Sequence, residues 1–318
     1  MAEILYKSKD KEEYRMISYE KLLKKLEQRN ITKSDLISLC GVSSRTIAKI
    51  GRGELIADYV LDKIAEFLEC KRNDIYEIIS DNKLLQILRD EKSMKLSGGI
   101  YHELQVRMTF NSNHIEGSSL SEEQTRLIFE THTFGADDGV PIDDIIETVN
   151  HFRAIDYVID ISEEVLSEDI IKHLHRIIKQ STIDSTKSWF AVGDYKKKAN
   201  IVGGHDTASP ENVEKEIKKL LSWYNCLKTV TINDVIEFHF RFERIHPFQD
   251  GNGRVGRLIA LKECLKNSIV PFIIEDTKKI FYYRGLSEWE NDKAYLIDTC
   301  LDGQDTFKAL MKYFSIEE

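Results

Sequence analysis

Apolar residues recur every three or four positions along most of the chain, and this spacing predicts a protein built mainly from helices. Near the N-terminus the pattern begins at Tyr19, and two short helices are expected after Thr32 and Ser43, which are good N-cap residues. A fourth helix is expected through Val60 and Leu68. Further along, the same spacing predicts helices over 121–129, 142–159, 168–179, 209–224, 231–245, 255–265, 275–290, 292–301 and 304–314.

Two stretches break this pattern. Between 190 and 201 short apolar pieces alternate with glycines, which predicts a β-hairpin in an otherwise helical chain. The pair Gly98-Gly99 is the best candidate for a hinge. We therefore expect a mainly α fold with a small helical domain over 1–79, a connector over 80–100, and a larger helical domain over 101–318.

Length and composition limit the class of protein. With 318 residues the chain has room for about two domains. No apolar run approaches the roughly 20 residues that span a bilayer, and the charged N-terminus does not resemble a signal peptide. The five cysteines form no CxxC pair, which predicts reduced, buried thiols. We expect a cytoplasmic protein that does not bind a membrane.

Charge is unevenly spread along the chain. The net charge is −9, yet residues 19–52 carry eight Lys and Arg against three Asp and Glu, a local net charge of about +5. This asymmetry suggests a small module with an anionic partner, attached to an acidic body.

Residues 246–257, which read His-Pro-Phe-Gln-Asp-Gly-Asn-Gly-Arg-Val-Gly-Arg, hold more reactive side chains than a packed core needs. Gly251 and Gly253 allow tight turns, and without Cβ atoms their N–H groups can approach an anion closely. An apolar helical face follows, so the loop lies at a helix N-terminus, which is a natural anion site. The set would suit a triphosphate and a divalent cation held beside a general base.

This string resembles the Fic motif, HPFx(D/E)GNGRxxR, and matches it at every defined position. The resemblance covers roughly residues 80–318 and implies a Fic helical bundle. Fic proteins transfer a nucleoside monophosphate, usually AMP from ATP, to a hydroxyl on a protein side chain. The implied substrates are ATP and the Ser, Thr or Tyr hydroxyl of a protein target, possibly the chain itself. No Walker A or kinase signature offers another route to ATP.

Two residues of the motif can carry the chemistry that the resemblance implies. His246 can act as general base on the target hydroxyl, since its ordinary pKa lies near neutrality. Asp250 is a hard oxygen donor for Mg²⁺ or Mn²⁺, which would neutralise phosphate charge. Phe248 is expected to anchor the loop in the core.

The rest of the motif is expected to bind phosphate. The backbone from Gly251 to Gly253, with the side-chain amide of Asn252, would hold the α-phosphate. Arg254 and Arg257 lie three apart, so both can reach the β- and γ-phosphates. A subgroup that phosphorylates its target characteristically has Lys for the first glycine, so Gly251 favours nucleotidyl transfer.

A segment at about 109–117 is expected to inhibit the enzyme. Ser112 to Gly117 fits (S/T)xxxE(G/N), the pattern of self-inhibited Fic proteins that carry it N-terminal to the Fic core. The resemblance implies that Glu116 pairs with Arg257 and places a negative charge where the γ-phosphate belongs. The same glutamate could position a water that removes AMP from the target.

The hairpin predicted over 190–201 occupies the position of the Fic flap, which covers the active site and orients the target by strand addition. Its candidate docking residues are Gly193, Tyr195, Lys196 and Ile201. The usual G-x-Y-R element has Lys196 in place of Arg, which keeps the charge but loses the bidentate fork. The alternative is a surface hairpin without such a role.

Residues 17–79 resemble a Cro/repressor-type helix-turn-helix domain. The resemblance rests on the opening at 32–36, on Gly41-Val42-Ser43 and on the closing segment 70–75. It implies a recognition helix over 43–52 and DNA contacts from Ser44, Arg45, Thr46, Lys49 and, near phosphate, Arg52. The alternative is a helix-turn-helix fold reused for dimerisation or for docking to the enzyme. Because the total charge is small, DNA affinity would depend on dimerisation and fall with salt.

Two hypotheses follow. The first is a self-inhibited protein adenylyltransferase with an appended DNA-binding domain. The second is a DNA-binding transcriptional regulator in which the Fic domain serves as a nucleotide sensor or dimer platform. Both can hold together, and a homodimer is expected because dimers are common in both families.

Overall fold

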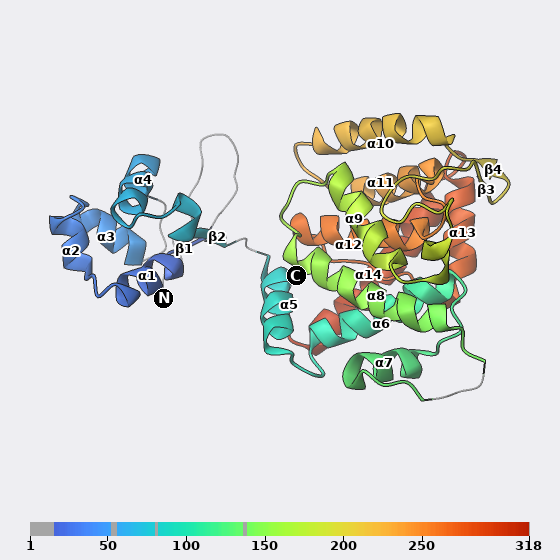
Figure 1. Ribbon diagram of the computed structural model, residues 1–318, viewed down its shortest axis with the longest axis horizontal. Helices are drawn as coiled ribbons and strands as arrows, with labels where there is room; N and C mark the ends of the chain where they lie inside the picture. The colour runs from blue at the N-terminus through green and yellow to red at the C-terminus, as the bar shows by residue number, and fades with distance from the viewer. Residues whose placement is uncertain (1–15, 52–55, 80–81, 136–138, 318) are drawn as a thin grey trace. The chain divides into compact units, whose positions relative to one another are not determined.

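The computed structural model describes residues 16–51, 56–79, 82–135 and 139–317 (Figure 1). It divides the chain into two compact units, Met1–Lys83 and Leu84–Glu318. Helices dominate both units, so the predicted mainly α fold is confirmed. In the described part of the chain, no helix is both long enough and apolar enough to cross a membrane.

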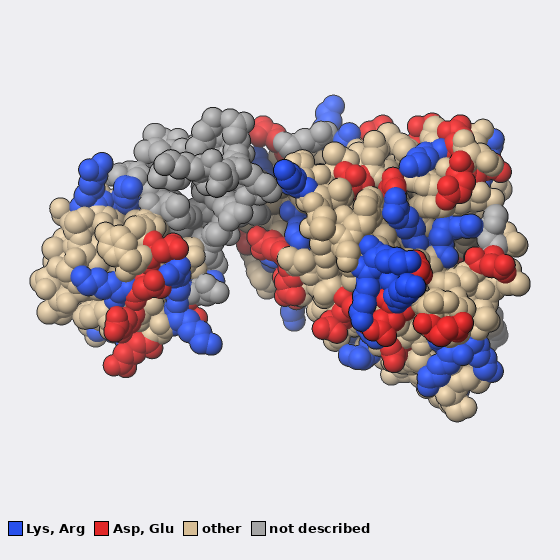
Figure 2. Space-filling model, turned by 90° about the horizontal axis from the view of Figure 1, so that it is seen from above, with Lys and Arg blue, Asp and Glu red and all other residues tan. Residues whose placement is uncertain are grey.

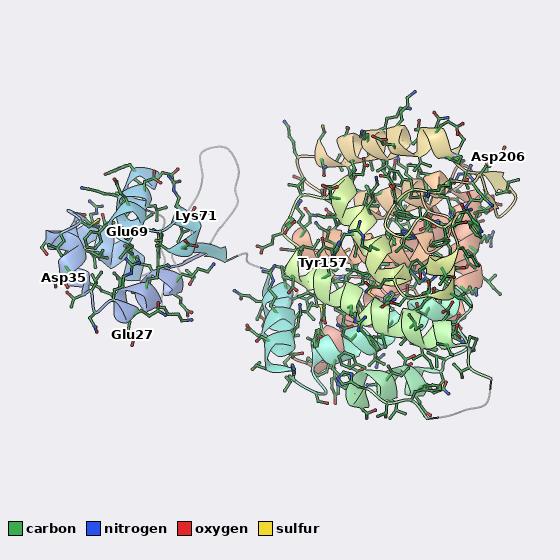
Figure 3. The ribbon with its side chains drawn as sticks, viewed as in Figure 1. Glu27, Asp35, Glu69, Lys71, Tyr157 and Asp206 are labelled. Carbon is green, nitrogen blue, oxygen red and sulfur yellow. The ribbon has the colours of Figure 1, made fainter. Side chains whose placement is uncertain are left out.

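The first unit packs four helices around a small core. They are α1 (Glu20–Gln28), α2 (Lys33–Ser38), α3 (Ser44–Gly51) and α4 (Asp58–Phe67), followed by the 3₁₀ turn Arg72–Asp74. The predicted cap at Thr32 is present: its hydroxyl accepts from the Asp35 N–H, and the carboxylate of Asp35, which is labelled in Figure 3, accepts from the Thr32 N–H. Leu22, Leu61 and Ile64 are among the buried residues of the core.

A short pair of antiparallel strands joins the two ends of this unit. Strand β1 (Met16–Ser18) pairs with β2 (Glu77–Ile79), with Ile17 opposite Ile78. The sequence pattern did not predict these strands, because three-residue segments are too short to show an alternation and the pairing is non-local.

The second unit is a helical bundle with one small hairpin. Its helices are α5 (Lys83–Met94), α6 (Ile100–Ile115), α7 (Glu122–Thr131), α8 (Ile142–Asp160), α9 (Glu168–Lys179), α10 (Pro210–Asn225), α11 (Ile232–Ile245), α12 (Asn252–Lys266), α13 (Lys279–Glu288) and α14 (Ala294–Tyr313). Helix α12 packs against α6, α8, α9 and α11. Its residues from Arg254 to Leu265 are all buried, so α12 is the centre of the bundle.

The hairpin lies later in the chain than predicted. Strands β3 (Ile201–Val202) and β4 (His205–Asp206) pair through a turn at Gly203 and Gly204, both with positive φ. This double positive φ is typical of the tight turns that close hairpins. Asp206 of β4 is labelled in Figure 3.

Most of the segment predicted as a hairpin is therefore irregular loop. Of the four predicted docking residues, only Ile201 lies in a strand, where it is 70% exposed. The backbone N–H of Lys196 donates to Pro247 O at 2.9 Å, so this part of the loop pairs with the motif instead of with a second strand.

Other details differ from the sequence pattern as well. The helices expected over 292–301 and 304–314 are one continuous helix, α14. In the segment expected as a connector, α5 contributes Leu84, Leu85 and Leu88 to the core of the second unit. The cysteines are free, but Cys226 is exposed, in contrast to the expectation of buried thiols.

Candidate active site

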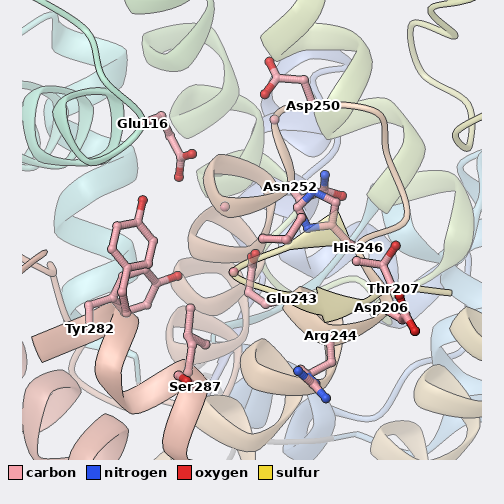
Figure 4. Close-up of a pocket in the computed structure, with 16 residues that line it drawn as sticks. Glu116, Asp206, Thr207, Glu243, Arg244, His246, Asp250, Asn252, Tyr282 and Ser287 are labelled. Atoms are coloured by element: carbon pink, nitrogen blue, oxygen red, sulfur yellow. The ribbon is translucent and has the colours of Figure 1, made fainter. Parts of the chain in front are cut away.

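A cavity of about 420 Å³ opens beside the motif (Figure 4). The end of α6, the hairpin, α11, the motif loop and α13 all contribute to its wall. Its lining includes Glu116, Val202, Asp206, Thr207, Glu243, His246, Asp250, Gly251, Asn252, Gly253, Tyr282, Tyr283, Leu286 and Ser287. The structure thus brings Glu116 to the motif across a wide sequence separation.

Helix α11 ends at the motif histidine. A capping box formed by Thr231 and Asp234 starts α11, and His246 is its C-cap in a left-handed conformation, with φ 51° and ψ 63°. The loop then folds back onto the core, where Phe248 is fully buried, as predicted, and stacks on His175 with ring centroids 3.9 Å apart. These two anchors fix where the imidazole of His246 stands.

The side chain of Asn252 closes the loop. Its Oδ1 accepts from the Phe248 N–H at 2.8 Å, and its Nδ2 donates to Phe248 O at 2.9 Å. Its oxygen and one N–H thus bond the backbone of Phe248, while Asn252 also lines the cavity, so its predicted contact with the α-phosphate stays a prediction.

His246 is held as a neutral imidazole. Burial and, next, the positive charge of Lys196 lower its pKa to about 4, while the nearby Glu116 and Asp250 oppose the shift. Lys196 is itself buried, and its ammonium donates to Asn200 Oδ1 at 2.7 Å and to a hydroxyl at 2.6 Å. A neutral imidazole at physiological pH is ready to accept a proton.

Gly193 and Tyr195 contact residues that hold the motif loop in place. The Gly193 N–H donates to His175 Nδ1 at 3.0 Å, so His175 carries its proton on Nε2, which lies 3.2 Å from Asp250 O and donates to it. Tyr195 packs against the same core, 5.9 Å from the Phe248 ring. Both residues thus brace the loop, which corrects their assignment to the hairpin.

Asp250 faces the cavity between two cations. Its Oδ2 accepts from Lys179 Nζ at 2.7 Å and from Arg254 Nη2 at 3.2 Å. Burial alone would raise the pKa of Asp250, but the charges of Arg254 and Lys179 lower it to about 2. The Asp250 side chain is 47% exposed and its carboxylate is ionised, so it could serve as an oxygen ligand for a metal ion.

Arg254 is not among the residues that line the cavity, and its predicted contact with the phosphates stays a prediction. Its side chain is 4% exposed and bonds the carboxylates of Glu147 and Asp250. It therefore acts on the site through Asp250.

Arg257 is bound by residues of α6. Its Nε donates to Ser112 Oγ and its Nη2 to Ser112 O, both at 2.9 Å, and Nη2 also contacts Glu116 Oε1 at 2.7 Å. The Glu116 carboxylate lies directly over Gly253: a Cβ built on that glycine would be 2.2 Å from Glu116 Oε1. An anion thus already covers the backbone that was predicted to bind one.

Several site residues were not found from the sequence. Lys179 and His175 lie four apart on α9, and this i,i+4 spacing could have signalled a shared face. Glu243 lies three residues before His246 on α11; burial raises its pKa to about 8. A Cβ on Gly256 would lie 2.5 Å from Glu243 Oε1, so Gly256 makes room for this carboxyl group.

The predicted DNA-contacting residues lie on α3. Ser44 and Arg45 are exposed, Thr46 and Lys49 are half-buried, and Arg52 lies outside the described residues. The Thr46 N–H and hydroxyl both contact Ser43 Oγ, which caps the helix, so Thr46 is partly engaged. Figure 2 shows acidic and basic side chains interspersed on the visible face of this unit.

Comparison with known proteins identifies both parts of the chain. Residues 165–264 match the Fic/DOC family, and residues 21–81 match the Cro/C1-type helix-turn-helix DNA-binding domain. Similar curated proteins include "Protein adenylyltransferase Fic" from Aedes aegypti, 26% identical over 76% of this chain and 46% of its own length. The Drosophila melanogaster protein of that name is 25% identical over 81% and 51%. The chain spans about half the length of these relatives.

Solved structures show the same fold. A Fic domain containing signaling protein from Bacteroides thetaiotaomicron covers 74% of this chain and 96% of its own, with 24% identity and a TM-score of 0.59. Fic-1 from C. elegans covers 93% and 87%, with 18% identity and a TM-score of 0.57. The chain therefore contains a Fic/DOC-family domain together with a helix-turn-helix domain of the Cro/C1 type.

Proposed function

We propose that this chain is a protein adenylyltransferase that transfers AMP from ATP to a Ser, Thr or Tyr hydroxyl of a protein, and that Glu116 keeps it switched off. One observation carries the proposal: the Glu116 carboxylate binds Arg257 and covers Gly253 inside a cavity that also holds His246 and Asp250. A buried arginine beside open backbone N–H groups is an anion site, and here a carboxylate of the same chain fills it.

The cavity offers distinct surfaces for the parts of ATP. Tyr282, Tyr283 and Leu286 of α13 and Val202 of β3 supply apolar and aromatic surface suited to a base. The N-terminus of α12 supplies the N–H groups and helix dipole that attract phosphate.

Asp250 is the residue that would hold Mg²⁺ or Mn²⁺. Among the described residues, no group of three His, Cys, Asp or Glu could hold a metal ion alone. A single carboxylate still fits, because Mg²⁺ is usually bound by one or two carboxylates together with substrate phosphates. When bound, the ion would neutralise phosphate charge.

The transfer step uses His246 as the base. The target hydroxyl gives its proton to the neutral imidazole, its oxygen bonds to the α-phosphorus, and the bond to the β-phosphate oxygen breaks to release pyrophosphate. The lowered pKa of His246, about 4, keeps the imidazole free to accept that proton. Arg257, once free of Glu116, lies beside Gly253, where a Cβ would be 2.9 Å from its Nη1, and is placed to meet the leaving phosphates.

Glu116 can act in the reverse direction as well. A carboxylate at this position can hold a water against the phosphorus of an AMP ester, so we include removal of AMP from the target in the proposal. Glu116→Gly should then gain transfer and lose removal.

The test is AMP transfer in a whole lysate with Mg²⁺ and α-labelled ATP, read by mass spectrometry. Glu116→Gly should label itself or another protein more strongly than the unmodified chain, and Glu116→Gly with His246→Ala should label nothing. Glu123→Gly, which removes an exposed acid from the first turn of α7, is the matched control and should behave as the unmodified chain. If Glu116→Gly labels no protein, itself included, the proposal fails.

A second function is carried by the match of residues 21–81 to a DNA-binding domain. We propose that α3 binds DNA through Ser44, Arg45 and Lys49, with the chain acting as a homodimer on two half-sites. If the Fic domain serves as a nucleotide sensor, DNA binding should change when ATP is added. Selection from random DNA, with and without ATP, tests this; no enriched sequence would leave the domain as a docking or dimerisation module.

A further inference from the structure

Lys179, the last residue of α9, lies buried beneath the motif loop. Its side chain is 2% exposed, and its ammonium contacts three carboxylates: Glu147 at 2.6 Å, Asp184 at 3.1 Å and Asp250 at 2.7 Å. Its aliphatic stem passes under Gly251, where a Cβ would lie 3.5 Å from Lys179 Cδ. A fully buried cation thus stands against the carboxylate assigned to the metal ion.

Lys179 is not the sole cation for any of these carboxylates. Glu147 also bonds Arg254, Asp184 also bonds Lys187 at 2.5 Å, and Asp250 also bonds Arg254 at 3.2 Å. Arg254 is shared by Glu147 and Asp250, so without Lys179 two cations would remain for three carboxylates, and Lys179 balances the charge of this group. Its contact with Asp250 also places a fixed positive charge where a metal ion would bind.

This positive charge bears on how a ligand can approach Asp250. Lys179 and Arg254 both contact its Oδ2, and among the described residues no basic side chain contacts Oδ1. Both cations thus bind the same oxygen of Asp250, and any ligand of this carboxylate must share it with a fixed ammonium. A divalent cation that binds Asp250 must come close to this ammonium, and like charges in a partly buried site repel strongly.

We propose that Lys179 makes divalent-metal binding at Asp250 conditional on bound nucleotide. Without nucleotide, the ammonium satisfies the charge of Asp250 and disfavours the ion. A bound triphosphate adds negative charge and oxygen ligands, which offset the repulsion, so that metal and nucleotide bind together. The proposal rests on the proposed function, because it takes the cavity to be a nucleotide site.

The competing explanation is that Lys179 only braces α9 against α8 and the motif loop. A brace predicts that loss of Lys179 lowers thermal stability and leaves the intrinsic metal affinity unchanged or weaker, since Asp250 would be held less firmly. The charge effect predicts tighter metal binding. The two explanations therefore differ in the sign of the change in metal affinity.

The experiment measures Mn²⁺ binding to the full chain by electron paramagnetic resonance, in the Glu116→Gly background, with and without α,β-methylene-ATP. Lys179→Met should bind Mn²⁺ about tenfold tighter than the parent without nucleotide, because one unit charge beside the ion is removed. The gain in Mn²⁺ affinity on adding the nucleotide analogue should shrink by a similar factor. Lys187→Met removes a cation from Asp184 without touching Asp250, and should match the parent.

Two further measurements keep the outcome clear. Lys179→Gln retains a polar group without the charge, so it tests the same effect if Lys179→Met unfolds. Lys179→Arg keeps the charge and should therefore bind Mn²⁺ as weakly as the parent. Unchanged or weaker Mn²⁺ binding in the folded neutral variant overturns the proposal. If the analogue binds none of the variants, the nucleotide site itself is refuted, while the nucleotide-free arm still decides whether Lys179 repels the ion.

Discussion

The contact between Glu116 and Arg257 sets how strongly this chain should be inhibited. The atoms lie 2.7 Å apart, the Arg257 side chain is 5% exposed, and that of Glu116 is 28% exposed. A hydrogen bond to a charged group contributes about 1.5–3 kcal/mol in proteins. In the proposed inhibition, ATP must displace this contact before its phosphates can bind Arg257, so the same free energy would be subtracted from ATP binding.

The free energy converts directly into affinity. Because each 1.4 kcal/mol corresponds to a tenfold change, Glu116→Gly should tighten ATP binding by a factor of roughly 10 to 150. The unmodified chain should keep a slow background transfer, about 1–10% of the variant rate at limiting ATP, because a contact of this strength leaves that fraction of molecules free.

The affinity is measured by titration calorimetry with α,β-methylene-ATP, and the rate by single-turnover self-labelling. Glu116→Gln keeps the length of the side chain but not its charge, so it should fall between the unmodified chain and Glu116→Gly. Equal ATP affinity in the three proteins would refute the reasoning, since it would mean that the carboxylate does not compete with phosphate. Glu123→Gly supplies the baseline for a glycine introduced elsewhere.

Three further outcomes are expected. The single-turnover rate of Glu116→Gly should be flat from about pH 5 to 8, since the pKa of His246 is about 4 and the imidazole stays neutral there. Lys196→Met should shift the acid limb of this pH profile upward, because removing a nearby cation raises the pKa of His246. A rate that falls with a midpoint near pH 6.5 in Glu116→Gly would contradict a lowered pKa of His246. Phe248→Ala, at a fully buried ring, should cost about 3–5 kcal/mol of unfolding free energy, seen as a lower thermal midpoint by calorimetry. Arg45→Ala on α3 should abolish selection of a specific DNA sequence, whereas Lys24→Ala on α1 should leave it intact.

The helices could largely be predicted because their signals are local. The N-cap predicted at Thr32 is present, and α10 and α11 lie close to the ranges 209–224 and 231–245 that the apolar spacing predicted. Gly251 has the positive φ, 81°, that its place before a helix suggested. Such features depend on a few neighbouring residues, so a sequence pattern can show them.

Errors arose where a glycine serves a distant contact. A helix break was predicted between 301 and 304, yet Gly303 lies inside α14 and packs closely there, since a Cβ on it would be 2.5 Å from Ile273 O. Glycine near a helix break and glycine for close packing look alike in sequence. The pairing of β1 with β2 depends in the same way on chain segments that are far apart.

The candidate site was predicted only where one motif carries it. The contact between Glu116 and Arg257 joins α6 to α12, and the resemblance to self-inhibited Fic proteins, not spacing, pointed to it. The cations around Asp250 come from α9 and α12, and no local pattern links Lys179 to the motif. Burial of Arg254 could not be foreseen either, because it depends on Glu147 of α8.

The geometry also restricts how the inhibition can be released. Ser112 binds Arg257 through two hydrogen bonds that do not involve Glu116. Ser112 lies in α6, and Glu116 is the C-cap of the same helix. If α6 moved away as a whole, Arg257 would lose Ser112 and the orientation that phosphate binding needs. Release should therefore be confined to Glu116 at the end of the helix, where Gly117, at φ +103°, lets the chain turn. Under the proposed function, activation should then need a rotation of the Glu116 side chain alone, while Arg257 stays in place to bind ATP.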